Sequence, residues 1–174
     1  MRTRILNVIV LAAIFVFQSV LPAQQSTAAT ASESNDLLLL APSHSPQRLS
    51  AADLKAMAHI TVTFHNSHTN ADETYSGVRL ADVLAKIGAP LGSELRGKAL
   101  ANYIVATGSD GYKAVLALAE VDPSFHPGEV LVADTMDGKP LDAHSGPFKL
   151  VVIEDKRPAR SVRNLVSIEL KAAE

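Results

Sequence analysis

Residues 74–88 read TYSGVRLADVLAKIG, and this stretch decides the class of fold that the chain can adopt. Its first five residues, 74–78, favour an extended strand because they are rich in β-formers. Four apolar residues then recur at the spacing of one helix face: Leu80, Val83, Leu84 and Ile87. Gly88 follows at the position where a helix commonly ends. A strand that runs directly into a short amphipathic helix is typical of α+β proteins.

Short strands and turns are predicted on either side of this stretch. Apolar and β-branched runs predict strands at residues 37–40, 60–64, 103–107, 112–118, 130–136, 148–153 and 166–170. Ser50 and Asp53 form a capping box, which predicts a short helix that ends near Met57. The polar run 65–73 is predicted as a hairpin loop, and residues 137–138 (Asp-Gly) as a tight turn. The predicted class is therefore α+β, with a mixed β-sheet and short helices.

Residues 1–23 have the composition of a signal peptide. Two arginines near the start precede an apolar stretch that runs to about Leu21, and small residues follow. Ala23 and Ala28 are the two expected cleavage positions. The alternative is a retained membrane anchor, for which the stretch lies at the short end of the usual length.

The rest of the chain is predicted to consist of a tether and one domain. Residues 24–36 are rich in Ala, Ser, Thr and Gln without apolar periodicity, which predicts a flexible tether, and residues 37–174 form the domain. The arginines of the leader are not a twin-arginine pair, so the general secretory route, which carries unfolded chains, is expected. We expect a periplasmic or secreted protein, without a membrane span after cleavage, that meets any ligand after export.

Composition excludes several classes of function. The charged fraction of 20% and the apolar fraction of 47% are those of a globular protein. The net charge of −2 argues against a nucleic-acid partner, because nucleic-acid surfaces need clustered positive charge. The chain contains no cysteine, which excludes a disulfide framework, a thiolate metal site and a cysteine nucleophile.

Five sequence blocks resemble the oxidoreductase molybdopterin-binding domain family of the sulfite-oxidase type. In chain order they are GVRLADVL (77–84), DGY (110–112) with a following Asp-Pro, EVLVA (129–133) with MDGKPL (136–141), HSGPFKLVV (144–152), and the closing pairs 162–163 and 168–169. The order and spacing of the blocks carry the resemblance, which covers roughly residues 59–171. A sulfite-oxidase-like molybdopterin-binding fold is the expectation that follows from it.

The resemblance implies an oxidoreductase domain that binds a molybdopterin cofactor. Members of this family hold the metal through one cysteine at the end of a strand, followed by Gly-Asn-Arg-Arg. The matching stretch here, residues 60–68, contains neither the cysteine nor the arginines. Lys149 stands where the family has an arginine. The ammonium group of a flexible side chain therefore replaces a planar guanidinium that can donate two parallel hydrogen bonds. The identity of the cofactor, and whether any reaction is catalysed, therefore stay open at this point.

Candidate ligand-binding residues follow partly from the resemblance and partly from charge. Tyr112 falls where the family has a tyrosine in its substrate pocket; the alternative is a strand aromatic packed beside a glycine turn. His144 and Lys149 lie in the fourth block. Four cations close in sequence could bind an anion such as phosphate, sulfate or a pyrophosphate, or could simply be exposed loop charges: Lys156, Arg157, Arg160 and Arg163.

His65 and His68, near Asp72 and Glu73, are the most metal-like cluster in the sequence. Imidazole and carboxylate groups suit zinc, copper or nickel. The alternative is an exposed hairpin tip, which is the usual setting of such polar residues.

Three functions from different classes are compatible with the sequence. The first is an exported, non-catalytic module that binds a small anion or a partner protein and carries no molybdenum. The second is a molybdopterin-dependent oxidoreductase with a metal ligand other than cysteine. The third is a small metal-binding protein that uses His65 and His68.

Overall fold

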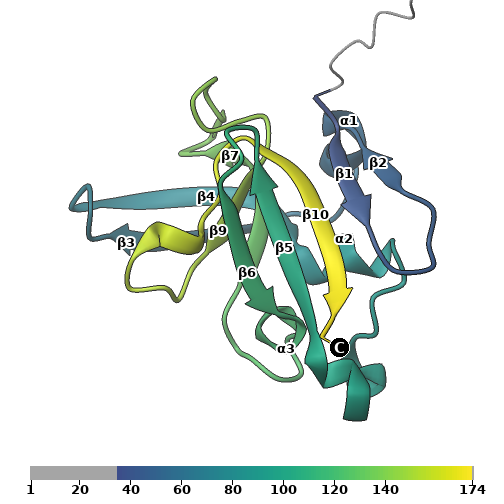
Figure 1. Ribbon diagram of the computed structural model, residues 1–174. Helices are drawn as coiled ribbons and strands as arrows, with labels where there is room; N and C mark the ends of the chain where they lie inside the picture. Colours follow the sequence, from purple (N-terminus) through teal and green to yellow (C-terminus); the bar gives the residue numbers. More distant parts are fainter. Residues whose placement is uncertain (1–34, 174) are drawn as a thin grey trace, which may run out of the picture. The chain divides into compact units, whose positions relative to one another are not determined.

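The computed structural model describes residues 35–173 (Figure 1). The predicted signal peptide and nearly all of the predicted tether lie outside the described residues, so these two assignments stay predictions. Within residues 35–173, no helix has the length and hydropathy needed to cross a membrane.

Sheet A contains five strands in the order β2-β1-β10-β5-β6. Their bounds are β2 (Gln47–Leu49), β1 (Leu37–Leu40), β10 (Leu165–Ala172), β5 (Asn102–Gly108) and β6 (Lys113–Ala117). Strands β1 and β10 pair in parallel, and the other neighbours are antiparallel. Leu38, for example, lies opposite Ser167. The predicted mixed sheet is therefore confirmed.

Sheet B is antiparallel and follows the order β3-β4-β7-β8, with β9 also paired to β7. Its strands are β3 (Ile60–Asn66), β4 (Ala71–Arg79), β7 (Val130–Met136), β8 (Lys139–Pro140) and β9 (Lys149–Val152). The Asp137–Gly138 turn joins β7 to β8, and both of its residues have positive φ, 49° and 76°. This is the backbone that an Asp-Gly hairpin turn requires, so the predicted turn is confirmed.

The helices are short. They are α1 (Ala51–Lys55), α2 (Leu80–Ala85), α3 (Leu118–Val121) and the 3-10 turns η1 (Gly92–Glu94), η2 (Gly97–Ala101) and η3 (Pro158–Arg160). The predicted capping box is present: Ser50 Oγ accepts from Asp53 N, and the Asp53 carboxylate accepts from Ser50 N. Helix α2 begins directly after β4, and Gly88 follows it with a φ of 69°. The sequence prediction for residues 74–88 is confirmed.

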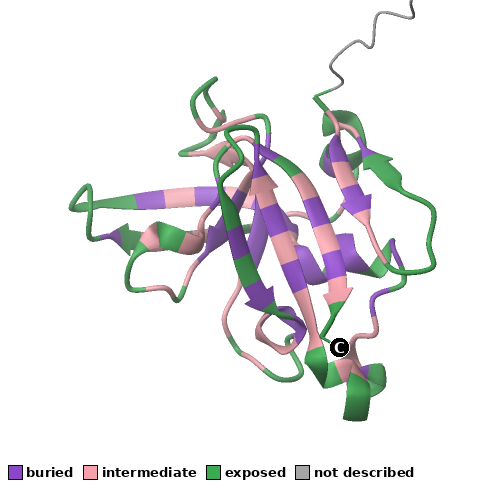
Figure 2. Cartoon of the chain, in the orientation of Figure 1, coloured by how far each residue is buried: buried purple, intermediate pink, exposed green. Residues whose placement is uncertain are grey.

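The main core takes its side chains from both sheets and from α2. Leu39 and Ile168 of sheet A, Val78 and Val132 of sheet B, and Leu84 of α2 all belong to this buried cluster. Buried and less buried residues alternate along β5 and β10, which is the period of a half-buried strand (Figure 2). Fully burying each such aliphatic side chain contributes roughly 1.5–3 kcal/mol.

Strands β4 and β7 approach each other so closely at Gly77 that no side chain fits there. A Cβ on Gly77 would lie 2.3 Å from the carbonyl oxygen of Val132. The ladder is also irregular at this point, between Ser76 and Gly77. Only glycine allows such close contact of two backbones without displacing one of them.

The predicted hairpin is confirmed, but its loop is shorter than the predicted residues 65–73. Strand β3 continues to Asn66 and β4 begins at Ala71, so the loop contains only residues 67–70. The polar residues of this ribbon pair across the strands: Thr63 and Thr74 share a hydroxyl hydrogen bond of 2.8 Å. Cross-strand polar pairs stabilise a ribbon that polarity alone would assign to a loop.

Candidate functional site

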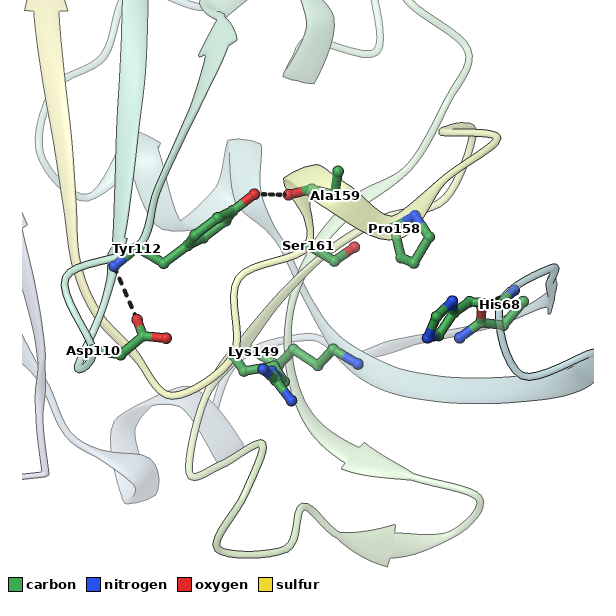
Figure 3. Close-up of a pocket in the computed structure, with 9 residues that line it drawn as sticks. His68, Asp110, Tyr112, Lys149, Pro158, Ala159 and Ser161 are labelled. Carbon is green, nitrogen blue, oxygen red and sulfur yellow. Dashed lines mark hydrogen bonds between the residues drawn. The ribbon is translucent and has the colours of Figure 1, made fainter.

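A cavity of about 400 Å³ lies between the end of the β3–β4 hairpin, the turn before β6, the start of β9 and the segment from η3 to Arg163 (Figure 3). Its polar lining is mainly cationic or neutral: Asn66, His68, Tyr112, Lys149, Ser161 and Arg163. Asp110 is the one carboxylate among the lining residues in the described part of the chain. The positive side chains would favour a negatively charged occupant.

A buried carboxylate lies beneath this cavity. Glu73 is 8% exposed. Its Oε1 accepts hydrogen bonds from Asn66 Nδ2 at 2.7 Å and from Thr69 Oγ1 at 3.2 Å, and its Oε2 accepts from Tyr75 Oη at 2.9 Å. Tyr75 Oη in turn accepts from Lys149 Nζ. A buried charge is tolerated when it is surrounded by donors in this way.

Lys149 reaches the cavity from the first residue of β9. Its Nζ lies 4.4 Å from the centre of the Tyr75 ring. Burial lowers the pKa of Lys149, and the positive charge of Arg163 acts in the same direction, while Glu73 opposes them. Burial and the nearby Glu73 carboxylate raise the pKa of Tyr75, so its hydroxyl stays protonated. In Figure 3 the Lys149 side chain extends from β9 toward the side of the cavity on which His68 lies.

Tyr112 forms the opposite wall and is held at two points. Its backbone N–H donates to Asp110 Oδ1 at 2.9 Å, and its hydroxyl donates to the carbonyl oxygen of Ala159 at 2.6 Å (Figure 3). Tyr112 is 49% exposed. The hydroxyl bond therefore ties the β5–β6 turn to η3 across the mouth of the cavity.

Arg163 lies in the cavity wall, and His144 lies behind it. The Arg163 guanidinium contacts His144 Nε2, and the backbone carbonyl of His144 accepts from Asn164 Nδ2 at 2.8 Å. His144 thus positions Arg163 and is not itself part of the lining.

Arg160 does not line this cavity. It donates to both oxygens of Asp155, at 2.7 and 2.9 Å, and to Glu120 at 2.9 Å. These carboxylates raise the pKa of Arg160. A second cavity of about 160 Å³ adjoins this cluster and is lined by further acidic residues, among them Glu129 and Glu154. The two carboxylates already occupy the donors of Arg160, which leaves few for an anion.

The two histidines predicted as metal ligands lie in different surroundings. His65 is exposed and pairs through Nδ1 with Asp72 at 2.9 Å. His68 lines the cavity, where Glu73 is already surrounded by donors. Among residues 35–173, no group of three or more His, Asp or Glu side chains is arranged to hold a metal ion. The metal site stays a prediction, without a third ligand in this part of the chain.

The sequence pattern of the oxidoreductase molybdopterin binding domain matches residues 30–174. The chain belongs to this family. The match confirms the resemblance of the five blocks, and with it the sulfite-oxidase-like fold class.

Among solved structures, the sulfane dehydrogenase SoxCD from Paracoccus pantotrophus is similar in fold, with a TM-score of 0.59 and 18% sequence identity. The similarity covers 80% of this chain and 39% of that chain, so the chain spans well under half the length of SoxCD. Identity at this level shows the fold alone. No curated protein matches the chain in sequence.

The residues around the cavity do not fit the cofactor as this family holds it. Molybdenum bound through a thiolate needs a cysteine, and the chain has none. Strand β3 ends at Asn66, whose amide is committed to Glu73. The remaining donors are an amine, a guanidinium, an imidazole and hydroxyls, which are suited to bind an anion and not to ligate a soft metal.

Four of the predicted site residues line one cavity: Tyr112, Lys149, Arg163 and His68. His144 contacts Arg163 from outside the lining, whereas Arg160 is ion-paired elsewhere and His65 is paired with Asp72 on the β3–β4 hairpin. Sequence reasoning missed Asn66, although the alternation of Ile60, Val62 and Phe64 already places Asn66 on the inward face of β3. It also missed the chain of hydrogen bonds from Lys149 to Glu73, because strands far apart in sequence supply its members.

Proposed function

We propose that this chain is an exported, non-catalytic module that binds a small anion in the cavity between Lys149 and Arg163. The observation that carries the proposal is the combination of two cationic side chains with the complete lack of cysteine. An arginine fork and a lysine amine bind oxyanions through charge-assisted hydrogen bonds. The fold is kept, and the donor that would hold the metal is missing.

Thermal unfolding in sulfate and in phosphate tests the anion site. A ligand that binds only the folded state raises Tm as its concentration exceeds Kd. We expect a rise in Tm for the wild type that is lost in Arg163→Ala. Arg157→Ala is the matched control, because Arg157 is an exposed cation of the same segment and does not line the cavity. Equal stabilisation of all three proteins would contradict the proposal.

Export is supported by the basic start and apolar stretch of residues 1–23. N-terminal sequencing of the protein from the exporting compartment tests it. A new terminus at or near residue 24 or 29 is expected, and an intact Met1 on the exported protein would contradict cleavage.

Family membership favours one alternative, a molybdopterin-dependent oxidoreductase whose metal has a ligand other than cysteine. Elemental analysis and pterin fluorescence on protein purified from its native compartment separate the two functions. Molybdenum and pterin near one per chain would establish the alternative and overturn the binding module.

A further inference from the structure

Lys149 combines features that an ordinary binding lysine lacks. Among residues 35–173, Arg79, Arg160 and Lys171 each pair with a carboxylate, whereas no ion pair of Lys149 is found. Its nearest polar partner is the hydroxyl of Tyr75, and Glu73 lies one hydrogen bond further on. The amine is therefore partly removed from water without a direct counter-ion.

A lysine in this setting loses its proton more readily than one in water. Burial lowers the pKa of Lys149, and the charge of Arg163 adds to that effect. Each unit by which an amine pKa falls raises its neutral fraction at neutral pH about tenfold. Lysines of this kind serve as nucleophiles toward carbonyl groups, a role that arginine cannot take.

The hydrogen-bond chain supplies a route for the proton that the amine must lose. Tyr75 Oη accepts from Lys149 Nζ and donates to Glu73 Oε2 at 2.9 Å. A proton that leaves the ammonium can pass to the tyrosine oxygen while the tyrosine proton passes to the carboxylate. The neutral amine is left facing the cavity, where Arg163 is available to bind a carboxylate.

We propose that Lys149 captures an α-oxo acid covalently and reversibly, as an imine. The amine nitrogen attacks the carbonyl carbon, the carbinolamine loses one molecule of water, and a C=N bond replaces the C=O bond. No electrons are exchanged, so no oxidant or reductant is needed. Arg163 binds the carboxylate of the same ligand. This inference rests on the proposed function, because it specifies the anion that the cavity takes.

Reductive trapping tests the proposal on the full chain. The purified protein is incubated with glyoxylate and cyanoborohydride at neutral pH, and the lysines are mapped by peptide mass spectrometry. Reduction of the imine leaves a carboxymethyl group on the reacting nitrogen. We expect Lys149 to be labelled several times faster than the exposed Lys139, because its amine is half-buried and loses its proton more readily. Sulfate should slow labelling of Lys149 and leave Lys139 unaffected.

Three variants sharpen the test. Lys149→Arg keeps the charge and should lose the fast site, whereas Lys139→Arg should retain it. Tyr75→Phe removes the hydroxyl of the proton route and should shift the pH profile of Lys149 labelling without changing that of Lys139. Mapping the wild type compares two lysines in one molecule, so the test does not depend on whether a variant folds.

The outcomes separate this proposal from the proposed function. Equal labelling of Lys149 and Lys139, with sulfate still raising Tm, would overturn the imine and leave the anion site standing. Fast labelling of Lys149 by both glyoxylate and neutral acetaldehyde, unaffected by sulfate, would overturn the α-oxo acid as ligand and the anion site with it. Fast labelling by glyoxylate alone, slowed by sulfate, supports both.

Discussion

Two arginines at and just after η3, Arg160 and Arg163, lie in opposite electrostatic surroundings. Arg160 is fixed by Asp155 and Glu120, and its side chain is 36% exposed. Arg163 contacts the ring of His144 and, with Lys149 and Tyr112, lines the cavity. The difference shows that cations close together in sequence do not necessarily belong to the same binding site. The carboxylates that surround each cation, such as Asp155 and Glu120 at Arg160, decide which cation is available to a ligand.

The largest expected effect concerns Glu73, the buried carboxylate beneath the cavity. Glu73→Ala removes the shared acceptor of Asn66, Thr69 and Tyr75 and leaves buried donors unpaired. We expect a loss of about 2–4 kcal/mol in the free energy of unfolding, measured by urea denaturation.

Asp72→Ala is the control for that change, because Asp72 is the neighbouring residue and its side chain is 73% exposed in its pair with His65. Its cost should stay below about 0.5 kcal/mol. Similar losses for the two variants would refute the assignment of Glu73 as the buried centre of the network.

The two arginines themselves give the next effect. Arg160→Ala should lower the free energy of unfolding by about 1 kcal/mol, after allowance for its partial exposure, because Asp155 loses its partner. Arg163→Ala should cost less than about 0.5 kcal/mol. Only the second variant should lose the stabilisation by sulfate. Thermal unfolding with and without sulfate measures the loss of stability and the sulfate effect for each variant. A larger loss for Arg163→Ala, or a lost sulfate effect in Arg160→Ala, would contradict the assignment of the two arginines.

A smaller effect is expected for Tyr112, whose hydroxyl connects the β5–β6 turn to η3 beside the cavity. Tyr112→Phe removes the hydrogen bond to the Ala159 carbonyl and should cost about 0.5–1 kcal/mol. Tyr103→Phe is the control, because no hydrogen bond of the Tyr103 hydroxyl is found within residues 35–173. Urea denaturation of the two variants should differ by this amount, and equal stability would show that the bond contributes nothing.

The smallest effect is expected for His59. This side chain pairs with one carboxylate, whereas Arg160 pairs with two, so its contribution to stability should be smaller. His59 Nε2 pairs with Asp134 at 3.1 Å, with side chains 23% and 20% exposed. Although burial opposes it, the Met57 carbonyl and Asp134 raise the pKa of His59 above 6.5. The stabilisation is thus complete below pH 6.5 and is lost as pH rises through the higher folded-state value.

His59→Gln should therefore flatten the pH dependence of the free energy of unfolding just above pH 6.5, by less than about 1 kcal/mol in total. Urea denaturation at a series of pH values measures it. An unchanged slope in the variant would mean that the pair does not contribute.

The sequence predicted the elements whose side chains follow a regular period. The helix at residues 80–85 followed from its apolar spacing, and the turn at residues 137–138 from its Asp-Gly pair. The β3–β4 ribbon was predicted too short because its polar residues pair across strands, which composition does not reveal. Local patterns predict local structure, whereas cross-strand partners become visible only in three dimensions.

The candidate site was predictable as a set of residues but not as a geometry. Tyr112, Lys149 and Arg163 were named from the family blocks and from charge, and they line one cavity. Arg160 was named on the same grounds, yet its partner Glu120 lies 40 residues away in sequence. The Tyr75 hydroxyl that accepts from Lys149 is 74 residues away. No spacing rule reaches over such distances, so the role of each cation required the fold.

The parallel pairing of β1 with β10 has a consequence for the order of folding. Sheet A places a strand at residues 37–40 beside one at residues 165–172, and β5 lies on the other side of that late strand. The ribosome must therefore synthesise nearly the whole domain before the central strand of this sheet is available. Sheet A therefore cannot be completed until translation of the domain is almost finished. A secretory channel accepts chains that have not yet folded, and the late completion of this sheet suits the exported fate proposed for the protein.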